Sequence, residues 1–214
     1  AWFDNGEILL DGKPIEKPLK ELTSQQITAI KKYIYPLNSF EPTSSDNTDL
    51  EILKKLVGNS KVVALGEATH GTSEIYKMKD RLTRYLAKNQ NFDIFSLEAY
   101  MQQAYLANDY TIKNTATLNE ALQNLVFFVW KTQEMSTMLQ WMKQYNNGSQ
   151  KILFTGFDMQ DATEPIKQLY KAFSEDKDFA QKIEKLSSAV KEFANENRGN
   201  TKSYTLKKEH ADII

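Results

Sequence analysis

The chain has 214 residues, 41% of them hydrophobic, and its 27 basic residues almost balance 28 acidic ones, for a net charge of -1. This size and composition are typical of a globular protein with one domain or slightly more. The small net charge favours neither nucleic acid nor an anionic membrane as a partner, so we expect neither. The absence of cysteine excludes disulfides, thiolate metal ligands and a cysteine nucleophile.

No apolar run approaches the ~20 residues that span a bilayer, and residues 1–4 lack the basic and apolar regions of a signal peptide. A signal peptide that has been removed leaves no trace in the sequence. We therefore leave open a cytoplasmic location and secretion after removal of a signal peptide.

The first third of the chain predicts an arm followed by two helices. Residues 1–20 contain two prolines and the dipeptide of Asp11 and Gly12, which indicate an extended lead-in with a turn. Apolar residues at helical spacing predict a helix over 21–35. A loop rich in Ser, Thr and Asn follows, and a cap near Asp46 predicts a short helix before Gly58.

Three apolar runs, 62–67, 92–98 and 152–158, each end in an ionisable residue, namely Glu67, Glu98 and Asp158. Short buried strands of a parallel sheet have near-continuous apolar sequences, and open α/β sheets bind ligands beyond the carboxyl ends of such strands. These strand ends therefore predict a site. His70, one of only two histidines, follows Glu67 closely and is the first candidate for catalysis.

An amphipathic helix over 72–89 joins the first two predicted strands as a βαβ unit. We expect an α/β fold with three layers, in which helices flank a mostly parallel sheet. Further helices are expected at 99–110, 117–128, 132–146, 163–174 and 177–197. The expected organisation is an extended lead-in and first helix over 1–45, an α/β core with the site over 46–175, and a helical extension with a polar tail over 176–214.

Three strands are few for a chain of this length, and the last four residues resemble the start of another element. We therefore expect that the fold is incomplete and that the tail leads into a second half. One set of aromatic and methionine side chains could line a pocket, but its helical spacing favours ordinary core. The set comprises Phe127, Phe128, Trp130, Met135, Met138, Trp141 and Met142.

Ordered sequence blocks at the predicted strand ends are similar to those of the erythromycin esterase family, including its members labelled succinoglycan biosynthesis proteins. The blocks are GEATHGTSE at 66–74, MKDRL at 78–82, SLEA at 96–99 and GFDMQ at 156–160. The resemblance covers about residues 50–165. It implies a hydrolase that attacks ester bonds, in the best-known members the macrolactone of erythromycin, by activating water and without a cofactor.

Matched by position, the resemblance implies that His70 is the general base and that Glu67 and Glu98 are the carboxylates around it. Histidine suits this role because its ordinary pKa, near ~6.5, leaves much of it neutral at pH 7. A carboxylate partner can orient the ring and stabilise the imidazolium that forms. The alternative for both carboxylates is a structural role as helix caps or ion-pair partners.

Candidate substrate-binding residues are Lys79, Glu74, Asp158 and Arg81. Lys79 stands where the macrolide esterases carry an arginine, and a lysine lacks the planar fork of a guanidinium, which leaves substrate recognition open. Asp158 could instead cap the next helix. Glu74 and Arg81 could instead be solvated or form ion pairs.

The family's second catalytic histidine lies much further along the chain than the matched blocks. His210 lacks the matching context and receives no role, so we expect this chain alone to be inactive. One alternative is a metal-dependent hydrolase, because Glu67, His70, Glu98 and Asp158 offer nitrogen and oxygen ligands, although our prediction assigns no metal. Another is a protein that binds a glycan or another small molecule without turnover. The expected partner is a small-molecule substrate, and the sequence does not predict the oligomeric state.

Overall fold

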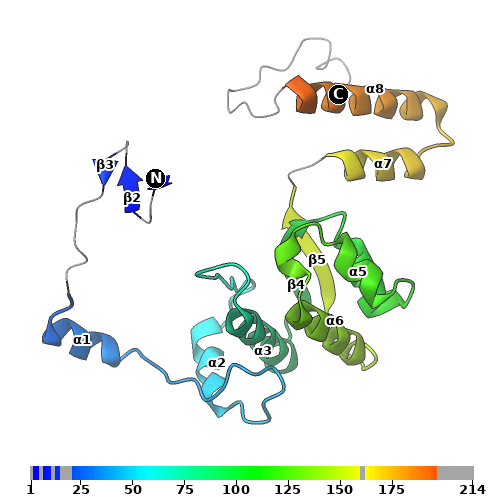
Figure 1. Cartoon of the computed structure of the whole chain (residues 1–214). Helices are drawn as coiled ribbons and strands as arrows, with labels where there is room; N and C mark the ends of the chain where they lie inside the picture. Colours follow the sequence, from blue (N-terminus) through cyan, green and yellow to red (C-terminus); the bar gives the residue numbers. More distant parts are fainter. Residues whose placement is uncertain (1, 5–6, 11–12, 15–20, 160–161, 197–214) are drawn as a thin grey trace. The chain divides into compact units, whose positions relative to one another are not determined.

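The computed structural model describes residues 2–4, 7–10, 13–14, 21–159 and 162–196. The chain divides into two compact units, Ala1–Asn38 and Ser39–Ile214. Figure 1 shows the elements of both units in the colours of the sequence.

The first unit contains a small antiparallel sheet and one helix. Its elements are β1 (Trp2–Asp4), β2 (Glu7–Leu10), β3 (Lys13–Pro14) and α1 (Ser24–Lys31). The sheet order is β1-β2-β3, and both strand pairs are antiparallel. The predicted turn at Asp11 and Gly12 lies outside the described residues. Thr23 and Gln26 form a capping box, so α1 begins at Ser24, and it ends at Lys31, which makes the helix shorter than the expected 21–35.

The second unit contains most of the helices and one parallel pair of strands. Its main elements are α2 (Ile52–Val57), α3 (Ser73–Gln90), β4 (Ile94–Tyr100), α4 (Tyr105–Asn108), α5 (Leu118–Asn124), α6 (Gln133–Tyr145), β5 (Leu153–Asp158), α7 (Thr163–Ala172) and α8 (Lys177–Glu196). Single turns of other helix types occupy Thr48–Leu50, Asp109–Lys113 and Phe128–Trp130. In the part of the chain that the structure describes, no helix has both the length and the apolar character to cross a membrane.

In the second unit, two helices differ by several residues from their predicted ranges. The helix expected at 99–110 begins only at Tyr105, because β4 continues as far as Tyr100. The helix expected at 117–128 ends at Asn124, where Leu125 adopts an extended conformation and is fully buried. In both places a tertiary contact, the strand ladder or the burial of a leucine, overrides the local helical pattern.

The parallel pair of β4 and β5 confirms the α/β class with a parallel sheet and flanking helices. The pairing runs from Ile94 opposite Leu153 to Leu97 opposite Gly156, and then shifts so that Tyr100 lies opposite Asp158. β4 therefore contains one extra residue at Glu98 and Ala99, a bulge of the kind that redirects side chains near functional sites. A Cβ on Gly156 would lie 2.2 Å from the Ala99 carbonyl oxygen, so only glycine fits there.

The first predicted strand, 62–67, was wrong. This run forms no strand in the structure, and Val62 is 81% exposed. A strand needs a neighbour for its N–H and C=O groups. Within the described residues, β4 pairs with β5 and no strand pairs with 62–67. Its apolar sequence alone is therefore insufficient to form a strand here.

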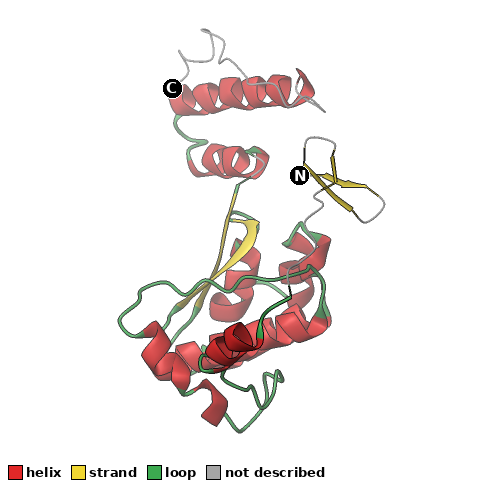
Figure 2. Cartoon of the chain, turned by 90° about the vertical axis from the view of Figure 1, so that its left-hand side faces the viewer, coloured by secondary structure: helices red, strands yellow, loops and turns green. Residues whose placement is uncertain are grey.

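The hydrophobic core is formed by the strand pair, the helices that follow β4 and residues of α3 that include Tyr76 and Ala87. Figure 2 shows the chain with its helices in red and its strands in yellow. Leu97, Ala99 and Phe154 contribute the strand side, and the helices supply alanine, leucine, methionine and aromatic side chains. This confirms the core interpretation of the aromatic and methionine set for most of its members. Phe128 is the exception, because it is 83% exposed.

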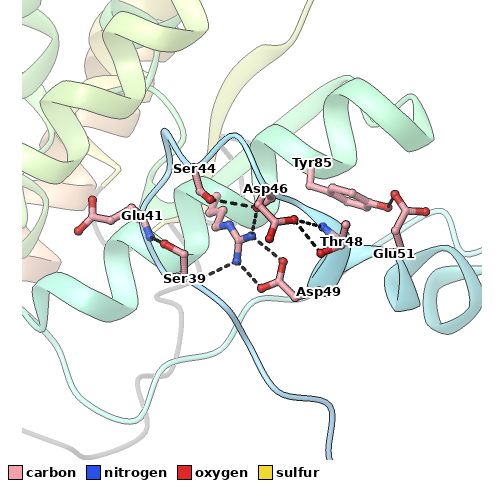
Figure 3. A network of polar contacts seen from close by, with 9 residues as sticks. Ser39, Glu41, Ser44, Asp46, Thr48, Asp49, Glu51 and Tyr85 are labelled. Carbon is pink, nitrogen blue, oxygen red and sulfur yellow. Dashed lines mark hydrogen bonds and ion pairs between the residues drawn. The ribbon is translucent and has the colours of Figure 1, made fainter.

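A buried arginine attaches the segment before α2 to α3 (Figure 3). Arg81 on α3 is 1% exposed and donates to both carboxylate oxygens of Asp49, at 2.8 and 2.7 Å. It also donates to the carbonyl groups of Ser39 and Asp46. The Asp46 carboxylate accepts from the Thr48 amide at 2.9 Å, but Asp46 is not a helix cap, because the N-caps of Thr48–Leu50 and of α2 are Asn47 and Glu51, and neither makes a side-chain capping bond. These contacts hold residues 39–51 against the helix.

Candidate active site

The turn before α3 brings Glu67, His70 and Lys79 together. One carboxylate oxygen of Glu67 contacts Nδ1 of His70. The other accepts a hydrogen bond from Nζ of Lys79 at 2.5 Å. The turn supplies the histidine and the second turn of α3 supplies the cation, so the start of the helix assembles the group.

The three side chains differ in their exposure to solvent. The side chain of Glu67 is 12% exposed and that of Lys79 is 19% exposed, whereas that of His70 is 61% exposed. Nδ1 of the histidine faces the carboxylate, and no described residue forms a hydrogen bond with Nε2. The arrangement therefore leaves one ring nitrogen accessible to a ligand or to water.

The electrostatics keep Glu67 ionised. Burial would raise the pKa of its carboxyl group, but hydrogen bonds with Lys79 and His70 outweigh this effect and lower the pKa below its ordinary value. An ionised carboxylate beside Nδ1 favours the tautomer in which Nδ1 carries the proton. In that tautomer Nε2 has a free lone pair, as a general base requires.

Backbone and side-chain contacts shape the turn that carries His70. Gly71 has a φ of 77°, a left-handed conformation that favours glycine, and its N–H donates to the hydroxyl of Tyr76 at 3.0 Å. Thr72 occupies the N-cap of α3, as predicted, but makes no side-chain capping bond. Instead, Ser73 donates to Glu134 of α6 at 2.5 Å. This bond is the main cause of the lowered pKa of Glu134.

Glu98 lies in the bulge of β4, and its side chain is exposed. No described residue forms a hydrogen bond with its carboxylate. Its backbone carbonyl accepts from Nε1 of Trp130 at 2.8 Å, and the Trp130 ring packs against Tyr76 with ring centroids 5.5 Å apart. The structure therefore connects Glu98 to the His70 turn through two aromatic residues, without a direct bond between Glu98 and His70.

The four predicted substrate-binding residues have different surroundings. Asp158, at the end of β5, accepts from the Met159 amide at 2.8 Å. Glu74 is exposed and interacts electrostatically with Lys77. Arg81 is buried in an ion pair, so the ion-pair alternative is confirmed for it and the solvated alternative is wrong. Its guanidinium has a structural role in the described part of the chain.

Sequence reasoning missed the residues that support the turn, namely Ser73, Tyr76 and Glu134. No local pattern marks them, because their partners lie up to 61 positions away. Next to them, a pocket of about 140 Å³ between the 41–43 loop, α3 and α6 is lined by residues that include Lys77 and Glu134, but not by His70. Within the described residues, no group of three or more His, Cys, Asp or Glu side chains is arranged to hold a metal ion.

Comparisons with known proteins show the family, and the family match includes the blocks at 96–99 and 156–160 but begins after those at 66–74 and 78–82. A model of the erythromycin esterase family matches residues 87–213, more than half of the chain. The Bacillus subtilis (strain 168) protein YbfO is 28% identical over 131 residues, which are 61% of this chain and 28% of that protein. Erythromycin esterase type II of Escherichia coli is 30% identical over 112 residues, or 52% of this chain and 26% of that protein.

The fold also agrees with a solved structure. The crystal structure of a protein titled as a succinoglycan biosynthesis protein superposes with a TM-score of 0.67 at 29% identity, over 79% of this chain and 45% of that one. This chain thus spans less than a third of the curated relatives that it matches and less than half of the solved structure. The matched blocks, the parallel strand pair and the family model agree, and the chain belongs to the erythromycin esterase family.

Proposed function

We propose that the protein is a hydrolase that activates water to cleave an ester or lactone, with His70 as the general base. The observation that carries this proposal is the contact of Glu67 with Nδ1 of a histidine that is 61% exposed. A histidine held in this way can accept a proton at Nε2. The same side chain buried on all sides would favour a structural role.

In the proposed reaction, Nε2 of His70 takes a proton from water as the water oxygen attacks the carbonyl carbon of the ester. Ionised Glu67 stabilises the imidazolium that forms. The tetrahedral intermediate then collapses and its C–O bond breaks. The leaving alkoxide takes the proton back from His70, so the products are a carboxylic acid and an alcohol. Neither serine nor a covalent intermediate takes part.

Glu98 is proposed as a second carboxylate of the site, because it lies exposed in a bulge at a strand end. We also propose that Lys79 acts at the edge of the substrate site, with Asp158 and Glu74 as further contacts. A macrolide is one substrate to test, because a relative from Escherichia coli is named erythromycin esterase type II. The metal-dependent hydrolase and the non-catalytic binding protein remain alternative proposals.

The test uses the full-length natural protein that carries this sequence. It compares hydrolysis of macrolides and simple esters by the wild type, by His70→Ala and by His210→Ala, each with and without a chelator. His210 is the matched control, as the other histidine of this chain. We expect His70→Ala to lower turnover about 10²–10⁴-fold, the usual contribution of a general base, and the control to keep it.

Each other outcome selects a different function. Wild-type turnover in His70→Ala would reject the proposal. Turnover that the chelator abolishes would favour the metal-dependent hydrolase. A melting temperature that a macrolide or glycan raises, without any turnover, would favour the binding protein, because a ligand that binds only the folded state stabilises it.

A further inference from the structure

We propose that Tyr76 is a positioning residue that holds the His70 turn in register with the strand end that carries Glu98. The inference rests on the proposed function for its catalytic consequence. Its structural part, the tie between the turn and the strand end, can be tested without any activity.

The hydroxyl of Tyr76 holds the turn directly. It accepts the hydrogen bond of the Gly71 amide at 3.0 Å, one residue after His70. Gly71 has a φ of 77°, so the bond acts on a residue in the left-handed region that favours glycine. Burial raises the pKa of Tyr76 above its ordinary value, so the hydroxyl stays neutral near pH 7.

The ring of Tyr76 lies next to Lys79 and Trp130. The Nζ atom of Lys79 lies 5.9 Å from its centroid, within the range of a cation–π interaction. On another side the ring packs against Trp130, with centroids 5.5 Å apart and planes at 39°. Tyr76 is only 7% exposed. It thus contacts the His70 turn, Lys79, which pairs with Glu67, and Trp130.

Trp130 completes the connection. Its Nε1 donates to the Glu98 carbonyl at 2.8 Å, in the bulge where β4 contains its extra residue. The path from Gly71 through Tyr76 and Trp130 to Glu98 therefore links two segments that approach the proposed site from different parts of the sequence. A shift of the base by about 1 Å can cost as much as 10²-fold in rate, so the tie has a catalytic effect.

The first test is Tyr76→Phe in the full-length natural protein, with Tyr85→Phe as the matched control. Tyr85 lies on the same helix, is 3% exposed, and also forms one hydroxyl hydrogen bond, to Glu51 at 3.3 Å (Figure 3). The activity-independent measurement is hydrogen exchange of the Gly71 amide. We expect faster exchange in Tyr76→Phe and unchanged exchange in Tyr85→Phe, with similar melting temperatures for the two variants.

The second measurement is turnover of an ester by the same variants and by His70→Ala. We expect Tyr76→Phe to lower kcat about tenfold with KM within about twofold, a loss below the upper limit for a misplaced base. Tyr85→Phe should keep the wild-type kcat. A merely structural role of Tyr76 would lower the melting temperature of Tyr76→Phe below that of Tyr85→Phe and leave its kcat per folded molecule unchanged.

A double variant tests whether the two aromatic residues act as one tie. If they do, Trp130→Phe combined with Tyr76→Phe should lower kcat little more than the worse single variant, because coupled residues are not additive. If the fold-losses in kcat of the two single variants multiply fully in the double variant, Tyr76 and Trp130 do not act through one path. The inference also fails if hydrogen exchange of the Gly71 amide is the same in Tyr76→Phe as in the wild type. It fails as well if His70→Ala abolishes turnover while Tyr76→Phe has the same kcat as Tyr85→Phe. Wild-type turnover in His70→Ala would instead reject the proposed function.

Discussion

Of two ionic clusters on α3, one includes a histidine that is exposed to solvent and the other is a buried ion pair. Lys79 and Arg81 are two residues apart, so they point to different sides of the helix. Lys79 joins Glu67 and a histidine that is 61% exposed, whereas Arg81 forms a buried pair with Asp49 in which the side chains are 1% and 2% exposed.

The difference separates a site from a structural anchor. Both terminal nitrogens of Arg81 are used by a carboxylate and by carbonyl groups within the chain (Figure 3). In the other cluster the interactions end at an accessible ring nitrogen. Both cations are on the same helix and each pairs with a carboxylate, so what distinguishes the two clusters is burial, together with the binding of both terminal nitrogens of Arg81 within the chain.

The largest effect should come from Glu67→Gln, which keeps the shape of the side chain but removes the charge that faces His70. We expect turnover in the full-length protein to fall about 10²–10⁴-fold, since the base loses the group that orients it and stabilises its charged form. Steady-state kinetics on the best ester substrate measures this loss. Glu51→Gln is the control, because Glu51 also pairs with a lysine but lies away from the turn. Equal activities of the two variants would contradict the comparison.

The next effect should be a loss of stability in Arg81→Lys. A lysine keeps the positive charge but cannot reproduce the fork that binds both oxygens of Asp49, so buried hydrogen bonds are lost, and each hydrogen bond to a charged group contributes about 1.5–3 kcal/mol to the free energy of unfolding. We expect a clear drop in the melting temperature, measured by calorimetry. Lys54→Ala removes an exposed ion pair and should leave the melting temperature unchanged. A wild-type melting temperature in Arg81→Lys would remove the distinction between the clusters.

The smallest effect should be a pH shift in Lys79→Met. The hydrogen bond from Lys79 helps to lower the pKa of Glu67 against the effect of burial, so its removal raises that pKa. If catalysis needs ionised Glu67, the acidic limb of the kcat/KM profile moves to higher pH. Lys77→Met is the control, because Lys77 lies on the same helix but pairs with Glu41. An acidic limb at the wild-type pH would show that Lys79 does not set the charge of Glu67.

The comparison also shows how much of the candidate site the sequence could reveal. The block around His70 and the two carboxylates was recognisable because its residues are close together or stand at strand ends. The hydrogen bond that Glu98 makes through its carbonyl, the role of Tyr76 and the contact of Ser73 with Glu134 were not recognisable. Glu98 and Trp130, Ser73 and Glu134, and Tyr76 and Trp130 are each tens of residues apart, and neither periodicity nor spacing reports such a partner.

By itself the sequence determined the long amphipathic helices α3 and α6, the two apolar strands β4 and β5, and the family to which the chain belongs. These features follow from local patterns of apolar residues, caps and short motifs. Only the tertiary structure decided that residues 62–67 form no strand, that Arg81 is buried and that His70 is exposed. Strand pairing and burial depend on which segments of the folded chain lie beside a residue, and local sequence does not encode that neighbourhood.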